Sequence, residues 1–265
     1  MTTPAPTLVE PLPVLAAMTY DPPLLNPTTY GLYGVTDWQP EGESRWLNGV
    51  EFRPTGNYSD QLAAGLWGGA WCGQPEAGML KTGERPAIPE VFQAMTVWAY
   101  DECDLTPQSR TDVEARAAQI LRMEEQYLVE REFAERLKLD AADLGPAQTA
   151  TSLKAAVGYL EGAMAIAGTI GYFHVGAQWA SQEFGLFVKQ GTKYVSPLGN
   201  IWVVGGGYVE GLDDMIVATS QPVGWRDAPT TRTAIDERHN IFAAVAERSV
   251  NIGYEAAVAA VTITP

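Results

Sequence analysis

Apolar and charged side chains alternate most regularly between Ser109 and Leu139, a stretch that contains neither glycine nor proline. Glutamate and arginine occupy its polar positions, many of them four residues apart, as Glu132 and Arg136 are. Its apolar residues recur at steps of three and four, which places them near one face of a helix. These residues are Val113, Ala117, Ile120, Leu121, Tyr127, Leu128, Ala134 and Leu137.

The start of this helix is marked by capping residues. Ser109 precedes Asp112 by three positions, and Thr111 precedes Glu114 in the same way, so either pair could satisfy the first free backbone N–H groups. The pattern predicts a rod about 45 Å long, whereas an ordinary globular helix has roughly 11–12 residues. A long, charge-bearing surface helix on an enzyme is the alternative interpretation.

Shorter elements are predicted after the rod. Gly145-Pro146 ends it, and a second helix follows over 149–167, where Gly158 and Gly162 would allow another backbone to approach closely. The rest predicts a mixed α and β arrangement. We expect strands at 169–175, 201–204, 215–219 and 230–235, a short helix at 176–184, a hairpin turning at 190–192, another short helix beginning near 240, and a closing strand over 254–263.

The chain before the rod has a different character. Residues 1–44 carry eight prolines together with apolar side chains that another surface must cover, which indicates an extended arm that either wraps its own domain or reaches a neighbouring subunit. In residues 45–100 we expect strands, turns and glycine loops, including a hairpin around Asn48-Gly49. Trp67 and Trp71 lie in a glycine-rich loop, where they would either form an interface or anchor in the local core.

Composition and charge restrict the classes of function that this protein can have. Apolar residues make up 46% of the 265 residues, enough for a core, and the net charge is −15, from 17 basic and 32 acidic side chains. Binding nucleic acid through its phosphates needs clustered lysine and arginine, so the charge argues against that class of protein. The first basic residue is Arg45, and no apolar stretch approaches the ~20 residues that span a bilayer. We expect the protein to be made and folded in a cytoplasm.

The residues that could support chemistry are few. His174 follows Gly-Tyr-Phe in an apolar strand and is predicted to be a hydrogen-bonded core residue, while His239 is predicted in a solvated turn. Cys72 and Cys103 lack the spacing of a disulfide framework or a CxxC motif and are predicted to be buried free thiols. A zinc site would have to gather these four residues from distant places, so no metal or cofactor is expected.

No catalytic motif is present. The sequence has no GxSxG elbow and no Walker A loop. Gly205-Gly206-Gly207 lacks the further glycine and amphipathic helix of a dinucleotide site and favours a bulge or a tight strand connection. The carboxylate pairs Asp213-Asp214 and Glu124-Glu125 are expected by chance in so acidic a chain. We predict no catalytic residue and no enzyme activity.

The segment from 169 to 208 runs from Gly171-Tyr172-Phe173-His174-Val175 through a short helix and a hairpin to Pro197-Leu198-Gly199 and Val203-Val204-Gly205-Gly206-Gly207-Tyr208. In this order of motifs it resembles capsid proteins of tailed actinobacterial phages. The charged helix before it, with Glu114-Ala115-Arg116-Ala117, is similar too, and so is the end from Ala246-Glu247-Arg248 to the strand after Tyr254. The resemblance covers roughly residues 88–265.

This resemblance implies the α+β Hong Kong 97-type fold of major capsid proteins, with an extended N-terminal arm, a protruding β-hairpin loop, a long spine helix, and peripheral and axial domains. The corresponding expectations are an arm at 1–44, the loop at 45–87, a peripheral domain with the spine at 88–146, an axial domain at 147–240, and a C-terminal return to the peripheral domain at 241–265. Some relatives cross-link a loop lysine, and Lys81 is the only lysine in this loop, but no acceptor is identified.

The function implied is that of a structural homo-oligomer, which forms pentamers and hexamers in the icosahedral virion shell of a tailed double-stranded DNA bacteriophage. Its partners would be copies of itself, with a second capsid, scaffold or decoration protein as a further possibility, and DNA would be enclosed without sequence-specific binding. An encapsulin-like shell, a vertex protein, a head–tail or tail-tube component, and a small soluble hydrolase stay open as alternatives.

Overall fold

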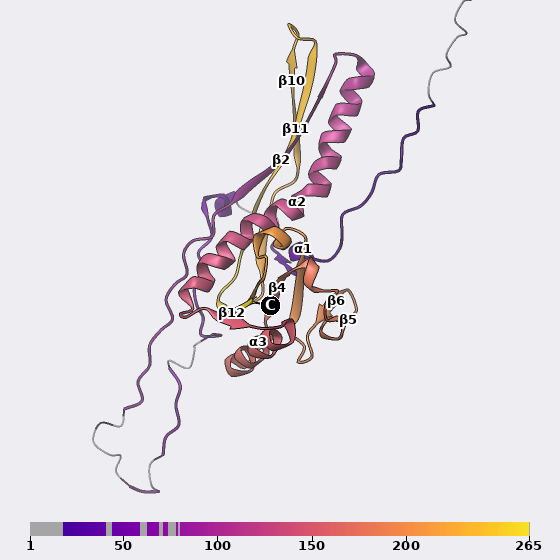
Figure 1. The fold of residues 1–265 in the computed structure, drawn as a ribbon. Helices are drawn as coiled ribbons and strands as arrows, with labels where there is room; N and C mark the ends of the chain where they lie inside the picture. The colour runs from indigo at the N-terminus through magenta and orange to yellow at the C-terminus, as the bar shows by residue number, and fades with distance from the viewer. Residues whose placement is uncertain are drawn as a thin grey trace, which may run out of the picture.

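The computed structural model describes residues 18–40, 44–58, 63–68, 71–73, 78 and 80–264. The body contains two β-sheets joined by one long helix (Figure 1). Three segments leave this body in different directions: the arm before α1, the loop that precedes β2, and a tall β-ribbon beside the first half of α2. The short helices are α1 (Leu32–Val35), α4 (Tyr208–Gly211) and three 3-10 turns at Ser44–Asn48, Ala177–Trp179 and Phe184–Leu186.

The predicted rod is confirmed as α2 (Pro107–Asp143), which is longer than expected at both ends. Thr106, and not Ser109 or Thr111, caps it: the Thr106 hydroxyl oxygen accepts from the Ser109 N–H at 3.3 Å. Pro107 occupies the first turn, where its missing N–H costs nothing. At 1.5 Å per residue the helix is about 55 Å long.

The first sheet forms the tall ribbon. Its strands are β1 (Asp37–Trp38), β9 (Val223–Arg226), β11 (Ile241–Gly253) and β10 (Thr230–Asp236) in that order, with β2 (Met95–Cys103) on the other edge of β11. The short helix predicted near residue 240 is wrong, because this region belongs to the 13-residue strand β11. Pairing with β2 and β10 overrides the helix propensity of its alanines.

The second sheet has seven strands in the order β3 (Gln148–Ala150), β12 (Ala257–Ile263), β8 (Met215–Thr219), β4 (Tyr172–Gly176), β7 (Ile201–Gly205), β6 (Lys193–Val195) and β5 (Val188–Gln190). The predicted hairpin at 190–192 joins β5 and β6. The predicted helix at 176–184 is wrong, since only 3-10 turns form there. The last strand, β12, lies in this sheet beside β8 and β3.

Helix α3 (Leu153–Ala167) covers one face of the second sheet and buries Leu153, Val157, Leu160 and Met164. Ser152 caps its start and Gly168, in a left-handed conformation, ends it. The expected close backbone approach at Gly158 and Gly162 is absent, because no atom of the described chain lies within 4 Å of a β-carbon built at either position.

Helix α2 passes between the sheets and supplies more buried residues to the main core than any other element. Buried side chains along it pack first against β2 and β11 and then against β4, β8 and α4. Phe133 lies at the junction, with ring centroids 5.7 Å from both His174 and Tyr254. The predicted apolar face is largely confirmed, although Leu128 is exposed and Val129 and Phe133 are buried instead.

The hairpin predicted around Asn48-Gly49 is wrong. Ser44–Asn48 forms a 3-10 turn, and Gly49 follows it with a φ of +99°. Val50 then pairs with Phe92 and not with a residue just before the turn. An Asn-Gly turn makes a hairpin only when the two flanking segments can pair with each other, and here the second segment finds its partner at the far end of the loop.

Candidate assembly site

The arm before α1 lies apart from the body of its own chain (Figure 1). Residues 18–30 contain neither helix nor strand, and their large apolar side chains are exposed. Met18 is 90% exposed, Leu24 73% and Leu25 69%. This segment carries one charged residue, Asp21, so nearly all of the surface that it presents to water is uncharged. An apolar segment of this kind is costly to leave in water and is stabilised when another surface covers it.

The base of the arm is fixed to α2 by polar side chains. The Gln119 amide donates to the Leu25 carbonyl oxygen at 2.9 Å, and Arg122 donates to the same oxygen at 2.5 Å and to the Asn26 side-chain oxygen at 3.0 Å. One turn further, the Gln126 amide donates to the Tyr30 carbonyl oxygen at 2.8 Å. These polar side chains of α2 therefore set the direction in which the arm leaves the body.

Glu130 joins the start of α1, helix α2 and the connection between β7 and α4. Its side chain is 1% exposed and accepts the backbone N–H groups of Leu32 and Gly207, each at 2.9 Å, and the Gln126 amide at 2.9 Å. Burial away from water raises the pKa of Glu130 to about 7, and the N–H donors oppose that rise because they stabilise the charged form. One carboxylate thus ties together three segments that are distant in sequence.

Sequence reasoning missed Glu130, although a signal was present. The residue lies three positions after Tyr127 and four before Ala134, within the apolar stripe that predicted the helix. A charged side chain on an otherwise apolar helical face must find partners when the face is buried. Its partners come from the arm and from the glycine run, so the pairing could not be read along the chain.

The glycine run 205–207 connects β7 to α4 and is not a bulge or a strand-to-strand connection as predicted. It also provides no phosphate cradle, because the Gly207 N–H is used by the Glu130 carboxylate. A β-carbon at Gly207 would lie 2.3 Å from the Tyr127 carbonyl oxygen and 2.8 Å from the Arg131 N atom. The absence of a side chain lets this connection lie directly on the spine.

We expect Gly207→Ala to lower the free energy of unfolding by about 1–3 kcal/mol, the usual range for overpacking. Gly207 has a φ of −68°, which alanine adopts freely, so the clash with α2 is the whole cause. The matched control is Gly206→Ala, whose β-carbon would lie 4.0 Å from Tyr127. Thermal unfolding of both variants measures the difference; equal melting temperatures would show that α4 shifts freely on the spine.

A second buried cluster holds the chain just after the arm. The Tyr33 hydroxyl donates to Glu125 at 2.7 Å, and Arg248 on β11 donates to the same carboxylate at 3.2 Å. Burial and the neighbouring Glu125 charge raise the pKa of Tyr33 far above its usual value. On the other side, the Arg226 guanidinium lies 4.3 Å from the Trp38 ring centroid. These contacts anchor α1 and β1 between the spine and the first sheet.

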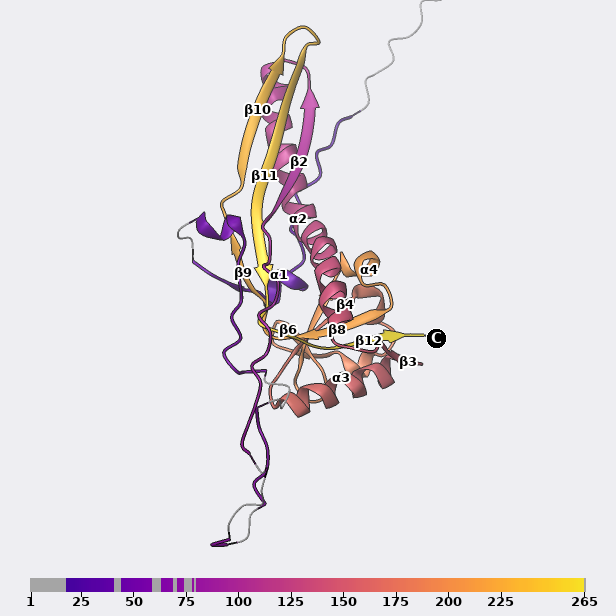
Figure 2. The same ribbon diagram turned by 90° about the vertical axis from the view of Figure 1, so that its left-hand side faces the viewer.

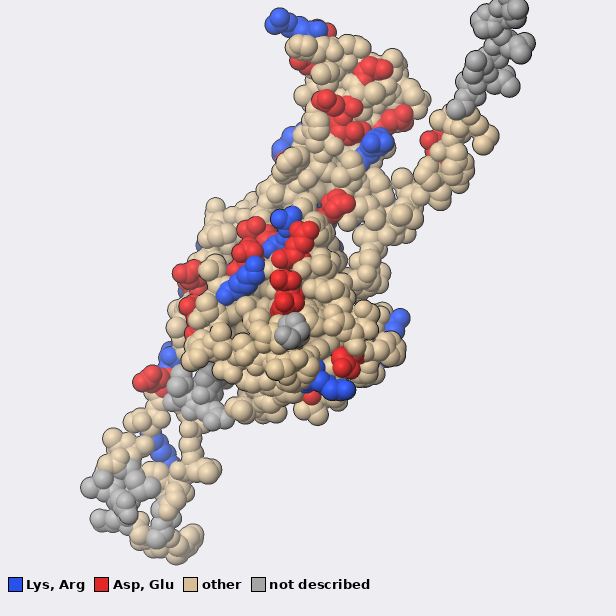
Figure 3. All heavy atoms as spheres, viewed as in Figure 1, with Lys and Arg blue, Asp and Glu red and all other residues tan. Residues whose placement is uncertain are grey.

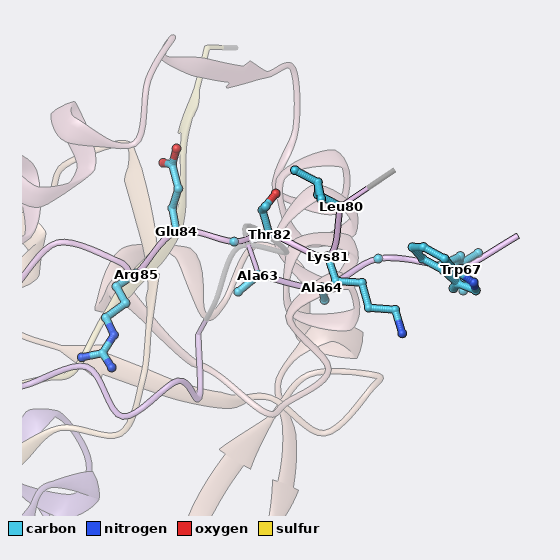
Figure 4. Close-up of a pocket in the computed structure, with 11 residues that line it drawn as sticks. Ala63, Ala64, Trp67, Leu80, Lys81, Thr82, Glu84 and Arg85 are labelled. Carbon is cyan, nitrogen blue, oxygen red and sulfur yellow. The ribbon is translucent and has the colours of Figure 1, made fainter. Parts of the chain in front are cut away.

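The loop before β2 extends from the opposite end of the body (Figures 1 and 2). Among its described residues, Leu66 and Trp71 are almost fully exposed and Leu80 is 77% exposed. Trp67 is 46% exposed, so within this chain neither tryptophan is anchored in a core. Between the two legs of the loop lies a hollow of about 710 Å³ (Figure 4), where the Lys81 ammonium is 4.9 Å from the Trp67 ring centroid.

Both legs of the loop are tied to the body. On the outgoing leg, Glu255 accepts from the Thr55 N–H at 2.9 Å and from the Asn57 amide at 2.8 Å. On the returning leg, Arg136 donates to the Glu90 carbonyl oxygen at 2.9 Å and pairs with Asp140 at 2.8 Å. The loop is therefore attached to the body near both of its ends.

Charge is distributed unevenly over these parts. Figure 3 shows acidic and basic side chains gathered over α2 and α4, whereas the described parts of the arm and of the loop are mostly uncharged. Exposed pairs on the spine include Lys138 with Glu135 at 3.0 Å and Arg131 with Glu210 at 3.8 Å. Such exposed pairs contribute little to stability. The difference in charge between the two helices and the two projecting segments therefore bears on which surfaces each of them can bind.

The residues considered for chemistry do not form a site. His174 is fully buried between Tyr208, 3.0 Å from Nδ1, and Thr219, 2.8 Å from Nε2, and burial lowers its pKa to about 3. The predicted core role is confirmed, and so is the exposed position of His239, which pairs with Asp236 at 2.7 Å.

The two cysteines contradict their prediction. Cys72 and Cys103 are exposed, because one lies in the protruding loop and the other ends an exposed stretch of β2. No group of three or more potential metal ligands occurs in the part of the chain that the structure describes. Likewise, none of its described helices is long and apolar enough to cross a membrane.

Comparison with known proteins rests on structure. No protein-family model matches the sequence, and no curated relative matches it. A solved chain of Mycobacterium phage Adephagia is 14% identical, with 94% of this chain and 95% of that one covered at a TM-score of 0.55. The mature capsid of bacteriophage PhiM1 is 12% identical, with 96% and 92% covered at 0.50.

A further match is the SrpI encapsulin complex from Synechococcus elongatus, which is 11% identical, with 94% of this chain and 92% of that one covered at a TM-score of 0.51. Identities this low establish the fold alone. Nearly the whole length of the chain is matched in each case. The chain therefore has the mixed α+β fold of phage capsid proteins, which an encapsulin shares.

Proposed function

We propose that this chain is a Hong Kong 97-type major capsid protein, which forms the icosahedral head shell of a tailed double-stranded DNA bacteriophage. One observation carries the proposal: on a fold shared with capsid proteins, the arm and the loop project from the body with apolar side chains that their own chain does not cover. Neighbouring copies would bury this surface, and that burial would drive assembly.

The parts of the fold then take roles in the shell. Residues 1–44 would be the donated arm, 45–87 the protruding loop, and α2 the spine of a peripheral domain at 88–146. Residues 147–240, which supply six of the seven strands of the second sheet, would form the axial domain at the centre of each ring of five or six. Because such rings use one surface against a different surface of the next copy, small angular changes at these contacts would allow both ring sizes.

The partners proposed are copies of this chain, together with a scaffold, decoration or second capsid protein where assembly needs one. The shell would be built in the cytoplasm of the bacterial host and become part of the virion. A net charge of −15 suits a container that encloses DNA without gripping it, since phosphate binding needs clustered basic residues. No residue is assigned a catalytic role.

We expect the purified protein, alone or with its phage scaffold, to form closed shells or discrete rings of five and six subunits. Electron microscopy after sizing by sedimentation velocity is the measurement. A species that stays monomeric or dimeric at high concentration and salt, with the scaffold present, would contradict the proposal. Rings that stack into open tubes would instead identify a head–tail or tail-tube component.

An encapsulin-like compartment is the second candidate, because an encapsulin is among the structures that share this fold. The two candidates differ in contents: a phage head packages DNA, whereas an encapsulin-like shell would enclose a protein cargo. Nuclease-protected DNA in particles isolated from infected cells distinguishes them. A soluble hydrolase finds no support, since the buried His174 lacks access to a substrate.

A further inference from the structure

Strand β10 presents an open edge to solvent. It is the terminal strand of the first sheet and pairs through β11 only. All seven of its residues, 230–236, are exposed, and Ile235 is 50% exposed. Among the described residues, no strand pairs with the outer edge of β10. A strand edge carries backbone N–H and C=O groups that can pair with another strand.

Several of the usual protections of a strand edge are missing from β10, although Arg232 and Asp236 place two charges on it. The segment Thr230-Thr231-Arg232-Thr233-Ala234-Ile235-Asp236 contains no proline, no lysine and no glycine, and threonine and isoleucine favour strands. Figure 2 shows β10 on the side of the ribbon that faces away from the second sheet. The edge is therefore regular, accessible and located at the outer margin of the subunit.

The sequence of β10 is complementary to itself in one register. When two antiparallel copies are centred on Ala234, Arg232 of each faces Asp236 of the other, and Thr233 faces Ile235. Opposite charges facing each other stabilise a strand pair, and like charges destabilise it. Centring on Arg232 would place two arginines face to face, and centring on Thr233 would leave both charged residues opposite uncharged ones.

We propose that β10 pairs with β10 of a second copy about a two-fold axis at Ala234, so that two first sheets become one continuous sheet. A two-fold contact uses the same patch on both subunits, which a self-complementary edge provides. Its place in the shell, joining subunits of adjacent rings, rests on the proposed function; the pairing itself does not.

Cysteine cross-linking tests the pairing. In an antiparallel pair, facing Cα atoms are about 4.5–5.5 Å apart, within the range of about 4.4–6.8 Å that a disulfide spans. Ala234→Cys, in a background of Cys72→Ser and Cys103→Ser, is expected to give a disulfide-linked dimer after mild oxidation. The matched control is Thr231→Cys, which is also exposed on the same strand. In the proposed register the Thr231 Cα atoms of the two copies would lie about 20 Å apart along the strands.

We expect at least tenfold more linked dimer for Ala234→Cys than for Thr231→Cys. Equal amounts for the two variants, or none for Ala234→Cys in any assembly that the protein forms, would overturn the proposal. Shells that assemble without this cross-link would overturn the pairing and leave the capsid function standing. A cross-linked dimer that never builds rings or shells would support the pairing while contradicting the proposed function.

Charge reversal tests the register. Added to Ala234→Cys, Asp236→Arg places an arginine opposite Arg232 at both ends of the pair and is expected to reduce the cross-link at least tenfold. Combining it with Arg232→Asp restores both opposite-charge pairs and is expected to restore the cross-link. Because Arg232 also pairs with Glu247 of its own chain, Glu247→Gln is one control, with no expected change. Asp236 also pairs with His239 of its own chain, so His239→Gln is the second control, likewise with no expected change. Reduction without restoration would overturn this register.

Discussion

Removal of residues 1–30 is expected to abolish closed assemblies while the body of the subunit stays folded. The body loses exposed hydrogen bonds from Gln119, Arg122 and Gln126 to the arm, whereas the buried bond between Leu32 and Glu130 remains in place. The apolar side chains that a neighbouring copy would cover are lost with the arm. Sedimentation velocity and electron microscopy report assembly, and circular dichroism reports the fold.

Point substitutions separate the contacts of the arm from its length. Leu24→Ser with Leu25→Ser removes two side chains that are 73% and 69% exposed and is expected to weaken assembly in the same direction. Leu139→Ser, at 66% exposure on α2, is the matched control outside the arm. Shells that form unchanged from the truncated chain would show that the donated-arm idea is wrong.

Glu130→Ala is expected to lower the free energy of unfolding by about 3 kcal/mol near pH 6. The substitution leaves the N–H groups of Leu32 and Gly207 buried without an acceptor, and each such loss costs about 1–3 kcal/mol. Chemical denaturation measures the change. Glu132→Ala, an exposed position on the same helix, is the control and is expected to change stability by less than about 0.5 kcal/mol. Similar effects for both would contradict the role of Glu130 as the link.

The titration of Glu130 gives stability a particular pH dependence. Its pKa is raised from 4.5 to about 7 in the folded chain, so the folded protein holds a proton that the unfolded chain releases. Its contribution to stability is therefore full below pH 4.5 and lost as the pH rises through 7. The loss between pH 5 and 8 is about 3 kcal/mol, at 1.36 kcal/mol per unit of pKa shift.

Glu130→Gln removes this titration and serves as the reference. His174 acts in the opposite direction, because its pKa is lowered to about 3 and stability falls as the pH drops through 6.5. Subtracting the variant's stability from that of the original protein at each pH cancels the contribution of His174. A difference that stays constant from pH 5 to 8 would contradict a raised pKa at Glu130.

Local patterns predicted the elements whose partners lie within a few residues or follow from periodicity. The rod and the helix over 149–167 were readable because burial of one face imposes a period on the sequence. The strand predicted over 169–175 was readable as a short apolar run, since both faces of β4 are buried. The regions around 46–52 and after 240 were misread. The segments on either side of the Asn-Gly turn do not pair with each other. The alanines of β11 are compatible with a helix as well as with a strand that lies between β2 and β10.

By itself, the sequence determined the charged spine helix, the proline-stiffened arm, the absence of a catalytic motif and the burial of His174, because each depends on residue type and local spacing. Tertiary structure alone decided that Glu130 would hold Leu32 and Gly207, that β12 would join the second sheet, and that β10 would keep an open edge. These outcomes depend on which distant segments come into contact. Hydrogen-bond and packing partners that are many residues apart produce no periodic pattern in the sequence of a single chain.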